Sequence, residues 1–476
     1  MSKTTGWARR LSVVADGKGL VGHAGGVLLR QCADRAGLTC ALSAALAVRG
    51  RSPGWDRGVV LVQLAVAIVL GATSMSDIAV LEQQAAVFGS PASDSEVRRA
   101  LVELDAKATS RIRRARVRVR AHVWDPLAAR DGGFAWVSVA GRVLTGWIVV
   151  DIDATLITAH SDKQGAAATF KKGWGFHPLG AWCANTGEVL SMLLGPGNAG
   201  ANTVADHLVV LEQAIAAIPA AFRAKILIRI DGAGATHELL ERIQALNTTR
   251  RVVRFCVGWK ITPVDEDAIA ALPHDVWVPA VDQDGELQDD CHVAEVTGLN
   301  ARMAGWPPGT RLIVRRSRPS RRHERKLTDF EKATGWRYQI TAIDYARMRG
   351  VPGSHHPWFA DVLYRQRGGA AEGRVRVNKA MGLAKLPSQT WDVNVGWVLA
   401  TNLAADLEAW TRLLGLHDEP ELALAEPATL RYRLWHLPAR LASHARRRIL
   451  RIPADWPWAT AFTTCWNRLV VLPDPG

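Results

Sequence analysis

The chain has 476 residues, of which 48% are hydrophobic and 22% are charged. This composition is typical of a folded globular protein and excludes a disordered or collagen-like chain. At about 150 residues per domain, the length allows about three domains. Lysine and arginine (59) outnumber aspartate and glutamate (45), which gives a net charge of +14. A soluble protein this basic usually binds a polyanion, most often nucleic acid, but charge alone does not separate an enzyme from a structural binding protein.

The cysteines and the apolar runs exclude two further classes. None of the six cysteines has Cys-x-x-Cys spacing, which argues against a disulfide framework or a zinc module and fits a reduced cytosol. The longest apolar run, residues 59–72, is shorter than the ~20 residues of a membrane span. We therefore predict a buried helix there, no membrane partner and no signal peptide.

The first 130 residues are predicted to be helical, because apolar residues recur at helical spacing in residues 41–47, 59–70 and 80–86. Ser93 and Glu96 form the pattern of a capping box, which begins a helix. A strip of arginines follows, at Arg111, Arg113, Arg114, Arg116, Arg118 and Arg120. The strip has two interpretations: a solvated helix face, or a row of phosphate contacts.

From about residue 140 the pattern becomes that of a mixed α/β protein. Residues 144–152, 174–183, 188–194 and 225–230 are predicted strands, and residues 202–218 and 236–246 are predicted helices. Residues 250–345 contain short β-prone runs among proline, glycine and aspartate, which predict a β-rich insertion. We interpret residues 311–326 as a long, mobile, basic loop, either a disordered segment or a clamp on nucleic acid. Two more helices are expected, in the second half of residues 358–386 and over residues 393–414.

Two aspartates follow predicted strands. Asp153 ends one strand and Asp231 ends another, and in α/β sheets functional groups gather where strands end. If the strands are neighbours, the two carboxylates form half of a site for two metal ions that catalyse phosphoryl transfer. Either aspartate could instead cap a helix or a turn. Asp151 is a rival of Asp153 on the same strand face, and the nearby His160 and Asp162 are either supporting groups or surface residues.

A third acid lies in the segment that begins at Tyr364. Glu372 and Lys379 are seven residues apart, about two helical turns, so they share a helix face, and Arg376 lies one turn after Glu372. A carboxylate flanked by cations could hold metal while the cations hold phosphates. The alternative is an ordinary surface helix with salt bridges between successive turns.

Taken together, these segments resemble bacterial insertion-sequence transposases of the DDE class, in the branch with a Tyr-Arg-Glu-Lys signature. Asp153-Ala154-Thr155 matches the Asp-x-Thr context of the first acid and favours Asp153 over Asp151, and Asp231-Gly232 matches the second. The signature spacing is matched from Tyr364 to Arg367 and from Glu372 to Lys379. Between Arg367 and Glu372, however, the chain has four residues where the family has three. This extra residue affects the expected role of Arg367 more than that of Glu372.

The resemblance implies an α/β, ribonuclease H-like mixed sheet with flanking helices, with Asp153, Asp231 and Glu372 as catalytic residues and metal ligands. It implies two Mg²⁺ or Mn²⁺ ions as cofactors, and Tyr364, Arg367, Arg376 and Lys379 as DNA-binding residues. The partners would be double-stranded DNA, as element ends and target, and a second copy of the chain in a homodimer. A cytoplasmic, nucleoid-associated location follows. The expected regions are a helical N-terminal DNA-end-binding region (1–135), a catalytic core in two parts (140–250 and 351–415), the β-rich insertion (251–350) and a helical, basic C-terminal region (416–476).

Three functions remain open at this point. The first is an active cut-and-paste transposase that binds terminal inverted repeats, cleaves DNA and transfers strands. The second is a catalytically inactive, transposase-derived DNA-binding regulator. The third is a metal-dependent nuclease without strand transfer. All three expected acids are present in matching contexts, which favours the first.

Overall fold

The computed structural model describes residues 12–48, 54–200, 204–321 and 323–474. The helices of the first 130 residues are α1 (Gly26–Arg35), α2 (Leu38–Leu46), α3 (Arg57–Val69), α4 (Ala85–Phe88), α5 (Asp94–Val102) and α6 (Ala106–Ala129). The later helices are α7 (Val204–Ala217), α8 (His237–Ala245), α9 (Pro263–Ala270), α10 (Asp329–Thr334), α11 (Pro357–Asn378), α12 (Trp391–Gly415), α13 (Pro420–Ala423), α14 (Pro427–Leu430) and α15 (Ala459–Val470).

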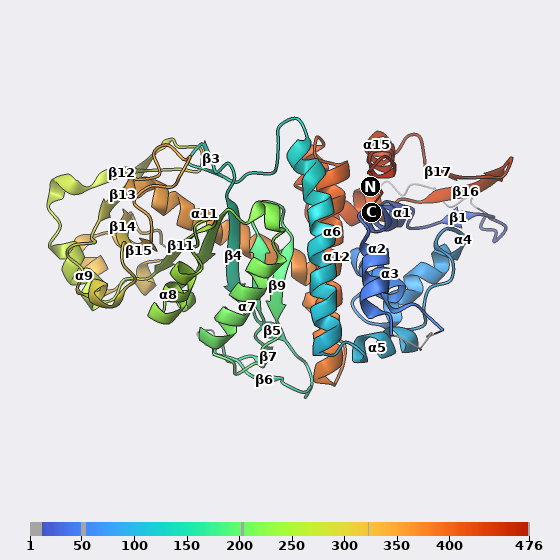
Figure 1. Cartoon of the computed structure of the whole chain (residues 1–476), viewed down its shortest axis with the longest axis horizontal. Helices are drawn as coiled ribbons and strands as arrows, with labels where there is room; N and C mark the ends of the chain where they lie inside the picture. Colours follow the sequence, from blue (N-terminus) through green and yellow to red (C-terminus); the bar gives the residue numbers. More distant parts are fainter. Residues whose placement is uncertain (1–11, 49–53, 201–203, 322, 475–476) are drawn as a thin grey trace, which may run out of the picture.

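A nine-stranded mixed sheet organises the middle of the chain, so the predicted α/β class is confirmed. Its strand order is β12-β13-β14-β15-β11-β10-β4-β8-β9. These strands are β4 (Ile148–Ala154), β8 (Leu179–Cys183), β9 (Val189–Leu193), β10 (Lys225–Ile230), β11 (Val252–Trp259), β12 (Val278–Val281), β13 (Leu287–Glu295), β14 (Arg311–Ser317) and β15 (Arg337–Ile343). Strands β4, β10 and β11 run parallel, while the other pairings are antiparallel. Helices α7 and α8 cover one face, and α11 crosses the other (Figure 1).

The β-rich insertion is built into this same sheet. Strand β11 lies inside the predicted insertion, but it pairs in parallel with β10, and β15 returns beside it. The prediction of a mobile loop over residues 311–326 is wrong for the first half of this segment, because Arg311–Ser317 form β14 between β13 and β15. Three of the arginines in residues 311–326 form ion pairs: Arg311 with Glu295, Arg315 with Asp361 and Arg318 with Asp290.

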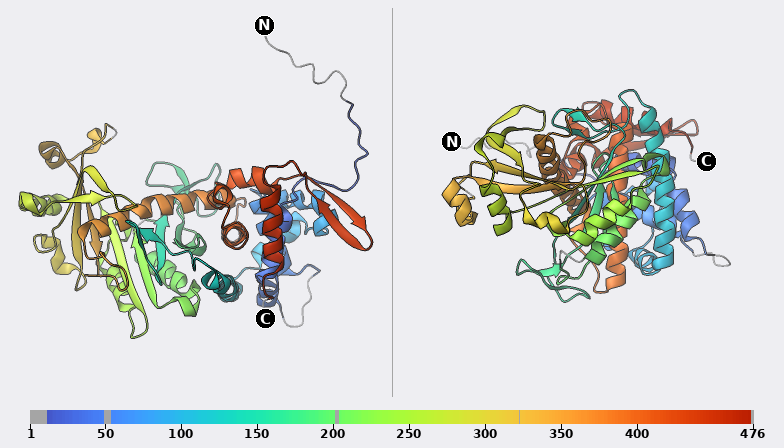
Figure 2. Two further views of the ribbon diagram at one scale, coloured as in Figure 1. Left: turned by 90° about the horizontal axis from the view of Figure 1, so that it is seen from above. Right: turned by 60° about the vertical axis from the view of Figure 1, so that its left-hand side comes forward.

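Six short strands complete the β-structure and form, with β16 and β17, three small sheets. Strands β2 (Ser138–Val139) and β3 (Arg142–Val143) form a ribbon, and β5 (Ile157–Thr158), β6 (Ala167–Ala168) and β7 (Trp174–Phe176) form a second sheet. The third contains β1 (Leu20–Val21), β16 (Ala439–His444) and β17 (Arg447–Arg451). It lies at the opposite end of the long axis from β12 and β13 (Figure 2).

The hairpin β16–β17 lies in the C-terminal region that we expected to be helical. Its turn consists of Ala445 and Arg446, which both have positive φ angles, 46° and 65°. Such a two-residue turn normally carries glycine, asparagine or aspartate. Because neither residue gives that signal, the sequence pattern does not reveal the hairpin.

Two long helices, α6 and α12, lie between the sheet and helices α1–α3 (Figure 1). Helix α12 is buried on almost every side, as expected of a helix that is apolar all round and lies within a core. Helix α3 is similarly buried, which confirms the helix predicted in the longest apolar run. Ser93 caps α5 by accepting a hydrogen bond from the Glu96 amide, but the Glu96 carboxylate binds Arg57 and Arg99 instead of completing the box.

The arginine strip on α6 is divided between the surface and the core. Arg116 and Arg120 are buried and form ion pairs with Asp406 of α12, so neither interpretation of the strip applies to them. Arg120 also pairs with the buried Glu188 at 2.7 Å. The other arginines of the strip, Arg111, Arg113, Arg114 and Arg118, are exposed. The periodicity of α6 explains the division, since its buried face also carries Ile112, Val119 and Val123.

Asp344, directly after β15, gives the first testable prediction. Burial raises its pKa to about 6 from an ordinary value of 3.8, against the opposing effect of the Phe255 amide, which donates to it. Because its pKa is higher in the folded state, Asp344 binds a proton more tightly when the chain is folded, and this protonation favours folding. The favourable contribution is complete below pH 3.8 and is lost as the pH rises to about 6. At 1.36 kcal/mol per pKa unit, we expect the wild type to lose about 3 kcal/mol relative to Asp344→Asn between pH 3.5 and pH 7.

Urea unfolding of the wild type and Asp344→Asn at several pH values measures this difference. Asparagine preserves the acceptor for the Phe255 amide, so the fold should be retained. The exposed Asp125 provides a control, and Asp125→Asn should follow the wild type at every pH. Parallel curves for the wild type and Asp344→Asn would show that Asp344 is not the titrating group.

Candidate active site

The ends of β4 and β10 bring two of the predicted acids side by side. The strands are parallel neighbours, and Ile230 is in register with Ile152. Asp153 and Asp231 each follow one member of that pair, so they occupy adjacent positions at the same edge of the sheet. Asp231 also accepts a hydrogen bond from the Ala233 amide at 3.1 Å, which orients it at the start of a short turn. The condition on which the two-aspartate hypothesis depended, that the two strands are neighbours, is therefore met.

Arg367 of α11 provides the cation beside this pair. Its Nη2 lies 3.3 Å from Oδ1 of Asp153 and donates to the carbonyl of Ile152 at 2.9 Å. Burial raises the pKa of Asp153, and the charge of Asp231 acts in the same direction, while Arg367 opposes both. Two carboxylates can approach at this edge because a buried guanidinium offsets their repulsion.

Asp151, the alternative to Asp153 as the first acid, already binds an arginine. It is fully buried and accepts two hydrogen bonds from Arg229 of β10, at 2.6 and 2.8 Å. Arg229 in turn donates to the Leu363 carbonyl and the Gln366 side chain of α11. Asp151 therefore links β4 and β10 to the helix, whereas Asp153 is partly exposed, with 18% of its side chain accessible. The sequence offered no signal for Arg229, since an arginine inside an apolar strand does not reveal its partner.

Glu372 lies on α11, but it does not join the two aspartates. Its side chain is exposed, and among the described residues no three His, Cys, Asp or Glu side chains form a cluster suited to a metal ion. At about 100° per residue, five residues of helix place Glu372 about 140° around the axis from Arg367. Ala371, one turn after Arg367, faces the sheet and is fully buried. The additional residue between Arg367 and Glu372 therefore has a direct structural consequence.

The other predicted DNA-binding residues are distributed along α11. Tyr364 donates a hydrogen bond to the Gly258 carbonyl at 2.8 Å, at the end of β11. Arg376 is exposed and pairs with Glu426 at 2.5 Å. Lys379 borders a cavity of about 610 Å³ that also includes residues 156–161 of the segment after β4.

This cavity is lined by two lysines besides the predicted Lys379. Lys163 and Lys385 line it together with Lys379 and His160. Burial lowers the pKa of Lys379, and the charge of Lys171 lowers it further, as expected where cations are crowded. Asp162 is exposed and is not among the lining residues. Little in the sequence indicated that Lys163 and Lys385 line this cavity, because tertiary packing brings these two distant residues together.

The donor chemistry of the edge fits a hard divalent cation. Asp153 and Asp231 present carboxylate oxygens, and Mg²⁺ needs only one or two protein carboxylates because substrate phosphates and water supply its other ligands. Comparison with known families then decides the class of the chain: the model of the family "Transposase DDE domain group 1" matches residues 3–474. The chain belongs to this transposase family.

Two further comparisons were made for this member of the transposase family. Among solved structures, the chain is similar to a piggyBac transposase in a synaptic complex with hairpin DNA, with a TM-score of 0.41 and 9% identity over 87% of this chain and 78% of that chain. No curated protein matches the chain. No helix in the described ranges is both long and apolar enough to cross a membrane.

Proposed function

We propose that the chain is the transposase of a bacterial insertion sequence, which binds terminal inverted repeats and catalyses metal-dependent cleavage and strand transfer of DNA. The observation that carries this proposal is the adjacent position of Asp153 and Asp231 at the ends of two parallel strands, in a member of a DDE transposase family. The meander β4–β8–β9 followed by parallel β10 and β11 supports a ribonuclease H-like core.

The chain's own groups have distinct roles in this proposal. Asp153, Asp231 and Glu372 would hold two Mg²⁺ or Mn²⁺ ions, which when bound activate the attacking oxygen and stabilise the leaving oxygen. Arg367 holds Asp153 in place and limits the repulsion between the two aspartates. Asp153 would be the first ligand, and the pairing of Asp151 with Arg229 supports this choice. Glu372 would have to turn toward the strand ends, and the glycines at 368, 369 and 373, which weaken a helix, would lower the cost of that movement.

Binding of DNA is assigned to the basic side of α11 and its surroundings. Tyr364, Arg376 and Lys379 would contact the strand near the cut, and Lys163 and Lys385 extend this surface. Arg367 would reach DNA only after leaving Asp153. The helical region 1–135 would recognise the element ends, with exposed arginines of α6 as contacts. The active assembly would be a homodimer that holds two ends, and it would act in the cytoplasm on nucleoid DNA.

A cleavage assay tests this function and its metal requirement. The full chain is incubated with a linear duplex that ends in the inverted repeat flanking its gene, with Mg²⁺, with Mn²⁺ or with EDTA. We expect strand cleavage at the repeat with either metal and none with EDTA. A supercoiled plasmid added to the reaction should then receive the cleaved end.

A second candidate, an inactive DNA-binding regulator, is favoured by one observation: Glu372 is exposed and lies one residue beyond the position that faces the sheet. Specific binding of the repeat without cleavage, in either metal, would support the regulator. Cleavage without strand transfer would instead support a nuclease.

A further inference from the structure

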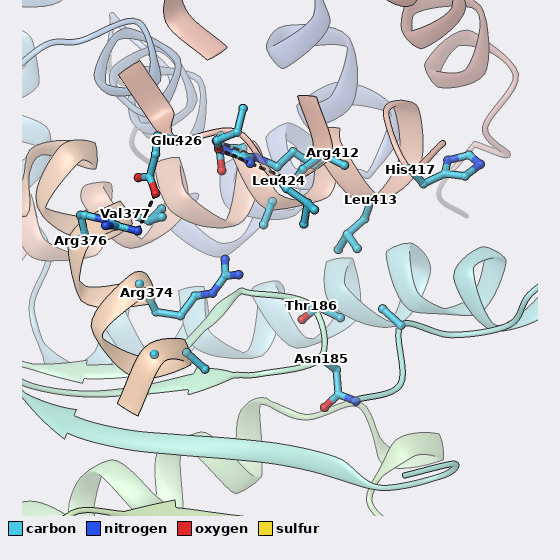
Figure 3. A pocket seen from close by; sticks show the side chains of 18 of the residues that line it. Asn185, Thr186, Arg374, Arg376, Val377, Arg412, Leu413, His417, Leu424 and Glu426 are labelled. Carbon is cyan, nitrogen blue, oxygen red and sulfur yellow. Dashed lines mark hydrogen bonds and ion pairs between the residues drawn. The ribbon is translucent and has the colours of Figure 1, made fainter. Parts of the chain in front are cut away.

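A second polar cavity lies away from the candidate active site. It has a volume of about 460 Å³ and is bordered by the β8–β9 turn, α11, the end of α12 and the segment around α13 (Figure 3). Strands β4 and β8 are antiparallel, with Val150 opposite Cys183. The turn at Asn185–Gly187 therefore lies beside the start of β4, whereas Asp153 lies near the end of that strand. The two sites are at opposite edges of the sheet.

Arg374 of α11 extends into this cavity (Figure 3). Within the described residues, its guanidinium forms no hydrogen bond or ion pair with the protein. It lies against Gly187, where a Cβ atom would collide with it and where the φ angle of +79° also favours glycine. Burial lowers the pKa of Arg374, although Glu408 opposes this effect. The turn thus leaves space for an arginine whose donors have no acceptor in the described ranges of the chain.

The other charged groups of the cavity already have partners. Arg412 binds Glu408 and the carbonyls of Ala423 and Ala425. Arg376 binds Glu426, and Arg130 donates to the Leu413 carbonyl at 2.9 Å. Four arginines and two glutamates line the cavity, so it carries an excess of positive charge, and Arg374 is its arginine without a hydrogen-bond partner in the described part of the chain.

A neutral donor and apolar walls complete the cavity. Thr186 is 6% exposed, and among the residues that the structure describes its hydroxyl has no oxygen or nitrogen partner, although the Cys183 thiol lies beside it. Leu413, Leu424 and Val377 contribute apolar surface. A guanidinium binds phosphate through paired hydrogen bonds, and the volume lies within the ~300–1,000 Å³ typical of small-ligand sites.

We propose that this cavity binds the phosphate group of a nucleotide through Arg374 and the Thr186 hydroxyl, with the sugar or base against its apolar wall. The nucleotide is either free or the terminal residue of a DNA strand, since both present the same phosphate chemistry. This site does not include Asp153 or Asp231, so binding of dAMP in EDTA can be tested separately from the metal-dependent catalysis proposed above, although Arg376, which is assigned there to DNA contact, also lines the cavity.

Titration calorimetry of the full chain with dAMP, in EDTA and at constant ionic strength, tests the proposal. We expect binding by the wild type that is weakened at least about tenfold in Arg374→Gln, weakened less in Arg374→Lys, and weakened severalfold in Thr186→Val. Inorganic phosphate should compete with dAMP. The exposed Arg242, paired with Glu212 on the surface, provides the control, and Arg242→Gln should bind as the wild type does. Asp153→Asn should also bind normally, which separates this test from the test of catalysis.

A 5′-phosphorylated single strand, added as a competitor, distinguishes the two sources. Displacement of dAMP by this strand, but not by its unphosphorylated form, assigns the cavity to a strand end; no displacement by either assigns it to a free nucleotide. Circular dichroism confirms that each variant is folded. Equal dAMP affinity in the wild type, Arg374→Gln and Thr186→Val would overturn the proposal, as would the absence of dAMP binding by the wild type at about 10 mM ligand, where even a weak site should fill.

Discussion

Asp153→Asn is expected to reduce DNA cleavage by at least about 10³-fold while binding of the inverted repeat survives. Asparagine at this position would retain the shape of the side chain but would lose the charge that attracts a divalent cation and Arg367. Asp231→Asn should have the same effect, because Asp231 is the adjacent carboxylate at the edge. Single-turnover cleavage of the repeat-ended duplex, measured beside a mobility-shift assay, separates the loss of catalysis from a loss of binding.

The matched control for this prediction is the exposed Asp267 of α9. Asp267→Asn removes the same charge at a distance from the edge and should cleave as the wild type does. Asp151→Asn should instead lower stability, because it breaks a fully buried pair with Arg229. If a folded Asp153→Asn variant cleaved normally while Asp151→Asn did not, the assignment of the first acid would be wrong.

Glu372→Gln distinguishes the two candidate functions more sharply than either aspartate. If α11 brings Glu372 to the aspartates when metal and DNA bind, its loss should reduce cleavage about as much as the loss of Asp153. If the chain is an inactive regulator, the wild type itself does not cleave, and Glu372→Gln changes nothing. Normal cleavage by Glu372→Gln would identify a two-aspartate site and remove Glu372 from the metal ligands.

Glu188→Ala is expected to cost about 3–5 kcal/mol of unfolding free energy, the largest stability effect predicted for this chain. Glu188 is fully buried at the start of β9 and pairs with Arg120 at 2.7 Å. It also accepts hydrogen bonds from the indole nitrogens of Trp124 and Trp410, at 2.6 and 2.7 Å. Removing the carboxylate would leave two indole donors unsatisfied and Arg120 with Asp406 as its one remaining carboxylate partner among the described residues.

Urea unfolding at pH 7 measures this loss. The control is Glu212→Ala, which breaks an exposed pair with Arg242 and should cost less than about 1 kcal/mol. Glu188→Gln retains one oxygen acceptor and should fall between the two. An equal loss in Glu188→Ala and Glu212→Ala would show that the buried network does not hold α6 and α12 to the sheet.

Local patterns were sufficient to determine the chain's class and most of its elements. The apolar periodicity predicted α3, α7 and α12, and a short apolar run predicted β10. Both kinds of pattern arise from neighbouring residues, so they can be read from the sequence. The resemblance to DDE transposases is confirmed by a family match over residues 3–474, whereas the bacterial source and the Tyr-Arg-Glu-Lys branch stay predictions. The positive-φ turn of β16–β17 was missed because its two residues are not those that normally adopt it.

Only the tertiary structure decided which charges are available for function. Nothing in the spacing of the α6 arginines indicated that Arg116 and Arg120 would be buried against acids of α12 and the β8–β9 hairpin, 68 to 290 residues away. The spacing also did not indicate that Asp151 pairs with Arg229, that Arg374 has no hydrogen-bond or ion-pair partner among the described residues, or that Glu372 points away from the aspartates. The physical reason is that the energy of a charged group depends on its burial and its partners. Both are determined by packing between segments that are distant in the sequence.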